Sequence, residues 1–191
     1  MKNIVILISG AGSNMAAIVK TAKNEDWSNK LGASVVAVIS TEADSPGLAF
    51  AHKQGIDTAV VKPKSYATRQ DFDQALMQKI ETYRPTLVVL AGFMRILTPA
   101  FVNHYADRLI NIHPSLLPAF TGLNTHQRAI DAGCKFAGAT VHRVTAELDV
   151  GPILAQVVVP ILQNDTALSL AIKVKSQEHV MYPKLIEQLL K

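Results

Sequence analysis

Two polar side chains stand two residues apart in an otherwise apolar stretch, INIHPSLLP at residues 110–118. If residues 108–113 form a strand, Asn111 and His113 share one face, and Pro114 ends the strand because it cannot donate to a central ladder. An amide offers N–H donors, and an imidazole can donate a hydrogen bond and pass a proton near neutral pH. The pair therefore suits a reaction in which negative charge develops on an oxygen. The alternative is a buried, hydrogen-bonded pair that only holds the following loop.

A carboxylate further along the chain could complete this site. Asp149 precedes a Gly-Pro turn in TAELDVGPILAQ, residues 145–156. A carboxylate beside His113 would orient the ring and favour its protonated form. Asn111, His113 and Asp149 are therefore a candidate catalytic trio, on the condition that the fold brings the two segments together.

The remaining histidines and the cysteine carry weaker signals. His126 and His142 have no Cys partner and no second close His, so no metal site is expected, and we interpret His142 as a core or surface residue. Cys134 has no catalytic partner in its surroundings and is not interpreted as a nucleophile.

A glycine-rich segment, ISGAGSN at residues 8–14, follows an apolar run and opens a helical pattern. Gly10 and Gly12 permit a tight turn, and Ser13 could cap a helix whose first amides favour an anion such as phosphate. The dinucleotide fingerprint requires glycine where Met15 stands, and the Gly-Lys-Ser/Thr of a Walker loop is absent. From this loop alone, phosphate binding and an ordinary strand-to-helix turn are about equally favoured.

Apolar runs of strand length alternate with helical patterns through the first two thirds of the chain. The expected helices include residues 13–23 and 69–84, and the expected strands are residues 3–8, 34–39, 58–61, 86–91 and 108–112. This alternation is typical of an α/β fold with a doubly wound, mostly parallel sheet flanked by helices. Ligands bind at the carboxyl ends of the strands in such sheets, where each segment described above falls.

The last third of the chain has a different pattern. GATVHRV at residues 138–144 and ILAQVVVP at residues 153–160 predict an antiparallel pair that completes a mixed sheet. A helix is predicted from Asp165 to Lys191, with Asn164 or Asp165 as its N-cap and with a kink or break at Pro183.

Composition indicates one compact domain spanning residues 1–191, with 49% hydrophobic and 18% charged residues. The net charge of +4 comes from scattered Lys and Arg and suits anionic small molecules, not nucleic acid. No apolar run approaches the ~20 residues of a membrane span. The start MKNIVILISGAGS is only superficially like a signal peptide, and with a single cysteine it favours a cytoplasmic setting.

Six segments together resemble the folate-dependent phosphoribosylglycinamide formyltransferases along essentially the whole chain, in the same order. They are ISGAGSN (8–14), LAGFMRILTPAFV (90–102), INIHPSLLP (110–118), TVHRV (140–144), ELDVGPILAQ (147–156) and QEHVMYP (177–183). The resemblance implies a formyltransferase-like fold. It also implies transfer of a formyl group from the co-substrate 10-formyltetrahydrofolate to the amine of glycinamide ribonucleotide, in purine biosynthesis.

The resemblance also implies roles for residues at matching positions. The catalytic positions match Asn111, His113 and Asp149, and the nucleotide-binding positions match Gly12, Ser13, Asn14 and Glu178. The folate-binding positions match Arg69, Met94, Arg95, Ile96, Leu97 and Asn111. No metal is implied, and the N-terminal half would bind the nucleotide while the C-terminal half would bind folate and carry the catalysis. Without the resemblance, Arg69 and Glu178 would be placed on solvated helix faces and residues 94–97 in the core with one solvated Arg.

Several alternatives remain at this point. Related transferases that act on methionyl-tRNA are expected to carry a further C-terminal domain, and formyltetrahydrofolate hydrolases an N-terminal regulatory domain. Neither fits in 191 residues. A non-catalytic nucleotide- or folate-binding module is a more distant alternative, and an unrelated doubly wound protein would require all these motifs to coincide by chance. The chain is expected to act on small molecules as a monomer or homodimer.

Overall fold

The computed structural model describes residues 1–191 and contains one seven-stranded sheet with the strand order β3-β2-β1-β4-β5-β6-β7. The strands are β1 (Lys2–Ile8), β2 (Ala33–Ser40), β3 (Asp57–Val60), β4 (Leu87–Leu90), β5 (Leu109–His113), β6 (Phe136–Arg143) and β7 (Ile153–Pro160). The first five strands are parallel, whereas β6 runs antiparallel to β5, and β7 antiparallel to β6. The predicted mostly parallel sheet with an antiparallel C-terminal pair is confirmed.

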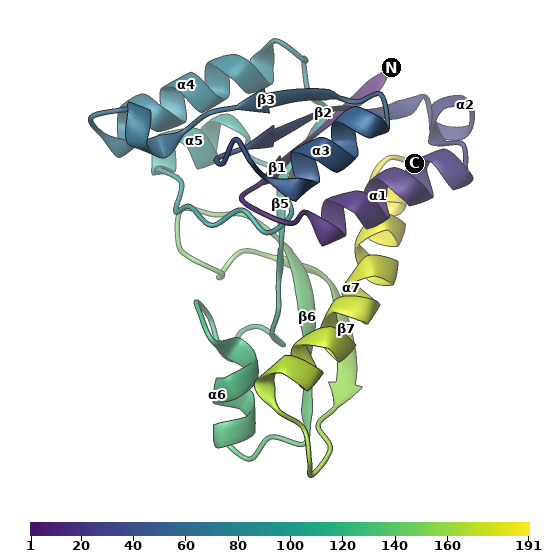
Figure 1. The fold of residues 1–191 in the computed structure, drawn as a ribbon, viewed down its shortest axis with the longest axis vertical. Coiled ribbons are helices and arrows are strands. Elements are labelled where there is room, and N and C mark those ends of the chain that lie inside the picture. The colour runs from purple at the N-terminus through teal and green to yellow at the C-terminus, as the bar shows by residue number, and fades with distance from the viewer.

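Helices cover both faces of the sheet (Figure 1). They are α1 (Ser13–Asn24), α2 (Trp27–Leu31), α3 (Pro46–Lys53), α4 (Arg69–Glu81), α5 (Pro99–His104), α6 (Thr125–Asp131) and α7 (Ala167–Leu189), with a short 3-10 turn at Pro63–Ser65. Alternate residues of a strand point to opposite faces. Ile4, Ile6 and Ile8 of β1 therefore enter the core under α1, α2, α3 and α7, while Val5 and Leu7 enter the core under α4 and α5.

The sheet is extended in opposite directions from β1 and β4: β2 and β3 lie on the outer side of β1, and β5 lies on the outer side of β4. The carboxyl ends of β1 and β4 are therefore the expected place for a ligand. The loops that follow the two strands are joined there. The backbone N–H of Ser9 donates to the carbonyl of Gly92 at 3.1 Å, and the N–H of Met94 donates to the Ser9 hydroxyl at 2.9 Å. The glycine-rich loop and residues 92–94 therefore form one connected edge.

The start of α7 differs from the prediction. Thr166, and neither Asn164 nor Asp165, is the N-cap: its side chain accepts from the N–H of Ser169, and the Ser169 hydroxyl accepts from the N–H of Thr166. This reciprocal pair satisfies two amides at once. Asp165 instead accepts from the backbone of Leu162 and pairs with Lys173.

A break at Pro183 is one of the two predicted outcomes and is wrong, because α7 continues from Ala167 to Leu189 (Figure 1). A kink at Pro183 stays a prediction. A proline removes one helical hydrogen bond, yet packing on both sides of this one holds the helix in place. Tyr182 is fully buried, and its hydroxyl donates to the carbonyls of Leu90 at 3.0 Å and Ile110 at 3.3 Å. Leu185 and Ile186 are buried in the same core.

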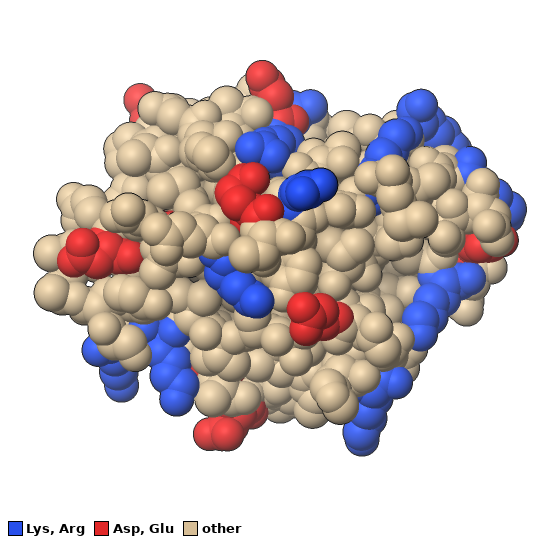
Figure 2. All heavy atoms as spheres, turned by 90° about the horizontal axis from the view of Figure 1, so that it is seen from above, with Lys and Arg blue, Asp and Glu red and all other residues tan.

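The surface carries no dominant charge on the face drawn in Figure 2, where basic and acidic side chains lie interspersed over a largely uncharged surface. Such a distribution lacks the continuous basic stripe typical of nucleic-acid-binding proteins. None of the helices combines the length and the apolar character needed to cross a membrane.

Candidate active site

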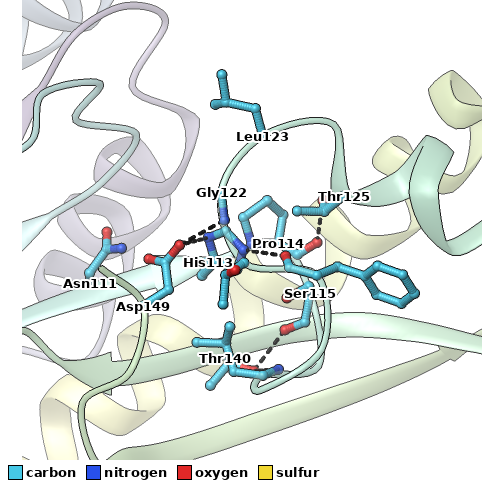
Figure 3. A network of polar contacts seen from close by, with 12 residues as sticks. Asn111, His113, Pro114, Ser115, Gly122, Leu123, Thr125, Thr140 and Asp149 are labelled. Atoms are coloured by element: carbon cyan, nitrogen blue, oxygen red, sulfur yellow. Dashed lines mark hydrogen bonds and ion pairs between the residues drawn. The ribbon is translucent and has the colours of Figure 1, made fainter. Parts of the chain in front are cut away.

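The structure brings the three candidate catalytic residues together at the carboxyl end of β5. Asn111 and His113 come from β5 itself, and Asp149 comes from the loop between β6 and β7. His113 Nδ1 lies 3.4 Å from Asp149 Oδ2, and both side chains are buried. Figure 3 shows the Asp149 carboxylate directed at His113. β5 ends at His113, as predicted from Pro114.

The loop after β5 supplies two further contacts to this pair. His113 Nε2 lies 3.0 Å from the carbonyl oxygen of Phe120, and the backbone N–H of Gly122 donates to Asp149 Oδ2 at 3.0 Å (Figure 3). Both ring nitrogens of His113 thus face oxygen acceptors. A neutral ring donates to one of them, whereas the imidazolium donates to both.

The first part of this loop is fastened to β6 by Thr140, which is fully buried. The Thr140 hydroxyl donates to the carbonyl of Ser115 at 2.7 Å and accepts from the N–H of Leu117 at 3.0 Å. Thr125, at the start of α6, donates to the carbonyl of Pro114 at 2.7 Å (Figure 3). The segment beside His113 is therefore anchored at several points, while Leu123 at the loop tip is 76% exposed.

We expect the loops at residues 114–125 and 143–150 to become more ordered when a folate analogue binds. Their exposed apolar side chains, Leu123, Leu148 and Val150, can be covered by a bound ring, and covered loops exchange amide hydrogens more slowly. Hydrogen exchange with and without the analogue measures this, and the change should be largest beyond the Thr140 anchor, at the loop tips. Amides of β6 serve as the internal control. Equal exchange rates in both loops, with and without ligand, would contradict the expectation.

The glycine-rich loop is held by close backbone packing. Gly12, the N-cap of α1, has a φ of 67°, and a Cβ there would lie 2.9 Å from the Met15 side chain and 3.2 Å from Gly47 Cα. The prediction that Ser13 caps the helix is wrong, because the left-handed turn at Gly12 makes Ser13 the first helical residue. No side chain caps α1, so its first N–H groups remain available to an anion.

Asn14 and Glu178 meet although they lie at opposite ends of the chain. Asn14 Nδ2 donates to Glu178 Oε2 at 2.8 Å, and both side chains are buried. Placement of Glu178 on a solvated helix face is therefore wrong. Burial raises the pKa of Glu178, which the hydrogen bond from Asn14 and the positive charges of Lys175 and His113 partly oppose. Glu178 thus ties α7 to the start of α1.

Residues 94–97 follow the backbone segment that is hydrogen-bonded to Ser9 of the glycine-rich loop. Met94 and Ile96 are 70% and 58% exposed, and Leu97 is buried, so placement of the segment in the core is right only for Leu97. Arg95 is exposed, as expected. The segment is anchored at its end by the buried Asp73 of α4, whose Oδ2 accepts from the N–H of Thr98 at 2.6 Å.

Arg69 is exposed at the first position of α4. No hydrogen bond or ion pair joins it to another candidate residue. The structure thus leaves it on a solvated helix face, where the residues alone would place it.

Sequence reasoning missed His142 as part of this site. Its side chain is 2% exposed, and Nε2 lies 3.4 Å from Asn111 Nδ2 and 3.8 Å from Asp149 Oδ1. Strand alternation in TVHRV indicates that one of its faces is buried, but the pairing of β6 with β5 is what places His142 opposite Asn111.

The Phe120 carbonyl and the Gly122 N–H were also missed, because backbone contacts carry no residue-type signal. No group of three or more His, Cys, Asp and Glu side chains is arranged to hold a metal ion.

A doubly wound sheet with an amide and an imidazole–carboxylate pair at a strand end is an arrangement that can stabilise a developing oxyanion, as group-transfer enzymes require. The chain belongs to the formyl transferase family, whose pattern matches residues 2–186. It is 47% identical to the phosphoribosylglycinamide formyltransferase of Escherichia coli over 184 residues, which is 96% of this chain and 85% of that protein.

Solved structures agree with this assignment. The phosphoribosylglycinamide formyltransferase of Brucella melitensis superposes with a TM-score of 0.92 and 46% identity, over 99% of this chain and 95% of that one. Glycinamide ribonucleotide transformylase 1 of Symbiobacterium toebii superposes with a TM-score of 0.94 and 40% identity, over 100% of this chain and 88% of that one. The formyltransferase-like fold is confirmed.

Proposed function

We propose that this chain transfers a formyl group from 10-formyltetrahydrofolate to the amine of glycinamide ribonucleotide, a step of purine biosynthesis. Its products are formylglycinamide ribonucleotide and tetrahydrofolate. The observation that carries the proposal is the buried contact between His113 and Asp149 beside Asn111. The similar proteins named for this reaction cover nearly the whole chain.

The reaction requires stabilisation of charge and movement of protons. The amine nitrogen attacks the formyl carbon, a C–N bond forms, and the carbonyl oxygen becomes an oxyanion to which Asn111 and His113 donate. The attacking nitrogen then loses a proton to solvent. The oxyanion re-forms the C=O bond as the bond from carbon to the folate nitrogen breaks, and a protonated His113 supplies a proton to that leaving nitrogen and regains one from solvent. Asp149 holds the His113 ring in one orientation through the contact at Nδ1.

The nucleotide would bind at the start of α1. The uncapped N–H groups around Gly12, Ser13 and Asn14 would bind its phosphate, and Glu178 would lie near its amine. The contact between Asn14 and Glu178 means that both ends of the chain would contribute to this subsite. The division of the chain into a nucleotide half and a folate half stays a prediction.

The folate would bind along residues 94–97, in the loop that follows β4. The exposed apolar side chains of Met94 and Ile96 support a folate-binding role for Met94, Arg95, Ile96 and Leu97, together with Asn111, and Arg69 would contact the anionic part of the folate. We assign no role to a metal. We further propose a cytoplasmic location and a monomer or homodimer.

The proposal is tested by following conversion of 10-formyltetrahydrofolate to tetrahydrofolate by absorbance, with and without glycinamide ribonucleotide. We expect conversion only when the nucleotide is present, with formylated nucleotide as the product by mass spectrometry. Conversion without the nucleotide would identify a hydrolase in which water is the acceptor. The absence of any conversion would favour the non-catalytic binding module.

Glu178→Gln is expected to lower kcat/KM for glycinamide ribonucleotide by roughly 10- to 100-fold, the size of a lost hydrogen bond to a charged group. The KM for folate should stay unchanged. Glu187→Gln is a matched control, because Glu187 lies on the same helix and pairs only with Lys191. Equal losses for both substrates would contradict the assignment.

The same variant should be more stable than the parent at neutral pH. Because burial raises the pKa of Glu178, the native state binds this proton more tightly than the unfolded state. The stability linked to this group is present below the ordinary pKa of a glutamate and is lost as the pH rises through the raised value. The difference in melting temperature between Glu178→Gln and the parent should therefore shrink on acidification.

A further inference from the structure

His142 is a buried titratable group for which the proposed mechanism has no use. It lies on β6 directly opposite Asn111 of β5, and only 2% of the residue is exposed. The charged or titratable groups that face it are Asp149 from the β6–β7 loop and His113 from β5. A histidine this deeply buried has to satisfy both ring nitrogens within the protein.

The hydrogen bonds of His142 define which nitrogen carries the proton. Nδ1 lies 2.9 Å from the carbonyl oxygen of Arg143, which can only accept, so Nδ1 is the protonated nitrogen. Burial lowers the pKa of His142, although the Arg143 carbonyl and the Asp149 carboxylate oppose the effect. The neutral ring therefore carries a lone pair on Nε2.

That lone pair faces the amide of Asn111. Nε2 of His142 lies 3.4 Å from Asn111 Nδ2, at the long end of a hydrogen bond, and 3.8 Å from Asp149 Oδ1. A neutral Nε2 accepts from the amide and makes no hydrogen bond to the carboxylate. A protonated Nε2 could not accept from the Asn111 amide. It would instead donate to the Asp149 carboxylate, which His113 also contacts.

We infer that His142 is a positioning residue: its neutral ring accepts one N–H of Asn111 and so turns the other N–H of that amide toward the oxyanion. An amide has two N–H groups and one oxygen, and without an acceptor at this place it can rotate to present the oxygen, which would repel the developing charge. The inference rests on the proposed function, because the oxyanion belongs to formyl transfer.

Two substitutions separate positioning from packing. His142→Gln keeps an acceptor near the place of Nε2, whereas His142→Leu fills a similar volume without one. We expect the single-turnover rate of formyl transfer to fall about 10- to 100-fold in His142→Leu and to stay within about threefold of the parent in His142→Gln, as for residues that orient catalytic groups. The KM values for both substrates should change little in either variant.

The exposed His104 of α5, which pairs with Glu81, provides a control, since His104→Leu should leave the rate unchanged. Urea unfolding midpoints show whether either His142 variant is misfolded. Equal losses in the Gln and Leu variants, or no loss in either, would overturn the inference. An inactive parent protein would instead contradict the proposed function.

The protonation state is tested on the parent protein without any activity assay. Long-range ¹H–¹⁵N correlation spectra distinguish the two neutral ring forms and the charged form of a histidine, and His142→Gln assigns the resonances. We expect the neutral form with the proton on Nδ1 at pH 7. A proton on Nε2 at that pH would overturn the inference, whatever the kinetics show.

Discussion

His113→Ala is expected to lower kcat for formyl transfer by about 10³-fold, a value inside both the ~10²–10⁴ range for loss of a general acid and the ~10²–10³ range for loss of an oxyanion donor. The reason is geometric. His113 is buried at the end of β5 with Asp149 Oδ2 3.4 Å from Nδ1, so alanine removes both the proton donor and the partner of that carboxylate. The KM values should change far less than kcat, because the lost interactions strengthen in the transition state.

The measurement is steady-state kinetics with both substrates varied, compared with His113→Gln. Glutamine can still donate to the Phe120 carbonyl, which His113 Nε2 contacts at 3.0 Å, but it cannot carry a transferable proton. If His113 acts in proton transfer, both variants lose activity to a similar degree. Recovery of activity in His113→Gln would instead show that the histidine only holds the loop.

Asp149→Asn is expected to lower kcat by on the order of 10²–10³-fold, because a neutral amide neither stabilises the imidazolium nor holds the ring in one orientation. Asp149 Oδ2 also accepts from the N–H of Gly122 at 3.0 Å, so the substitution should loosen the tip of the loop after β5. Hydrogen exchange at residues 120–124 should therefore accelerate in this variant.

Glu147→Gln is the matched control for Asp149→Asn, since Glu147 is an exposed carboxylate in the same loop without an ion pair. The double variant of His113→Ala and Asp149→Asn gives a sharper criterion. If Asp149 acts through His113, the double variant should be nearly as active as His113→Ala alone. Multiplied losses would show that the two residues act independently.

Local patterns in the sequence were sufficient for most of the fold. The alternation of apolar runs and helical spacing predicted the five parallel strands, because buried parallel strands consist of continuous apolar residues and flanking helices carry one apolar stripe. Two β-rich runs with only a loop between them predicted β6 and β7. Pro114 correctly predicted the end of β5. The errors at Ser13, at the start of α7 and at Pro183 arose where one residue's local preference was outweighed by a turn, a capping box or core packing.

The candidate site depended more strongly on contacts between distant segments. The residue types of Asn111, His113 and Asp149 indicated oxyanion chemistry from the sequence alone, but their proximity is a property of the fold. The contact of Asn14 with Glu178 spans 164 positions, and it forms only because α7 packs against α1. His142 faces Asn111 only in the observed β5–β6 register, since a shift by one residue would turn it to the other face. The sequence by itself thus determined most of the secondary structure and which side chains could do chemistry. Strand register and helix packing decided which of those side chains meet. Both depend on long-range burial, which no local pattern records.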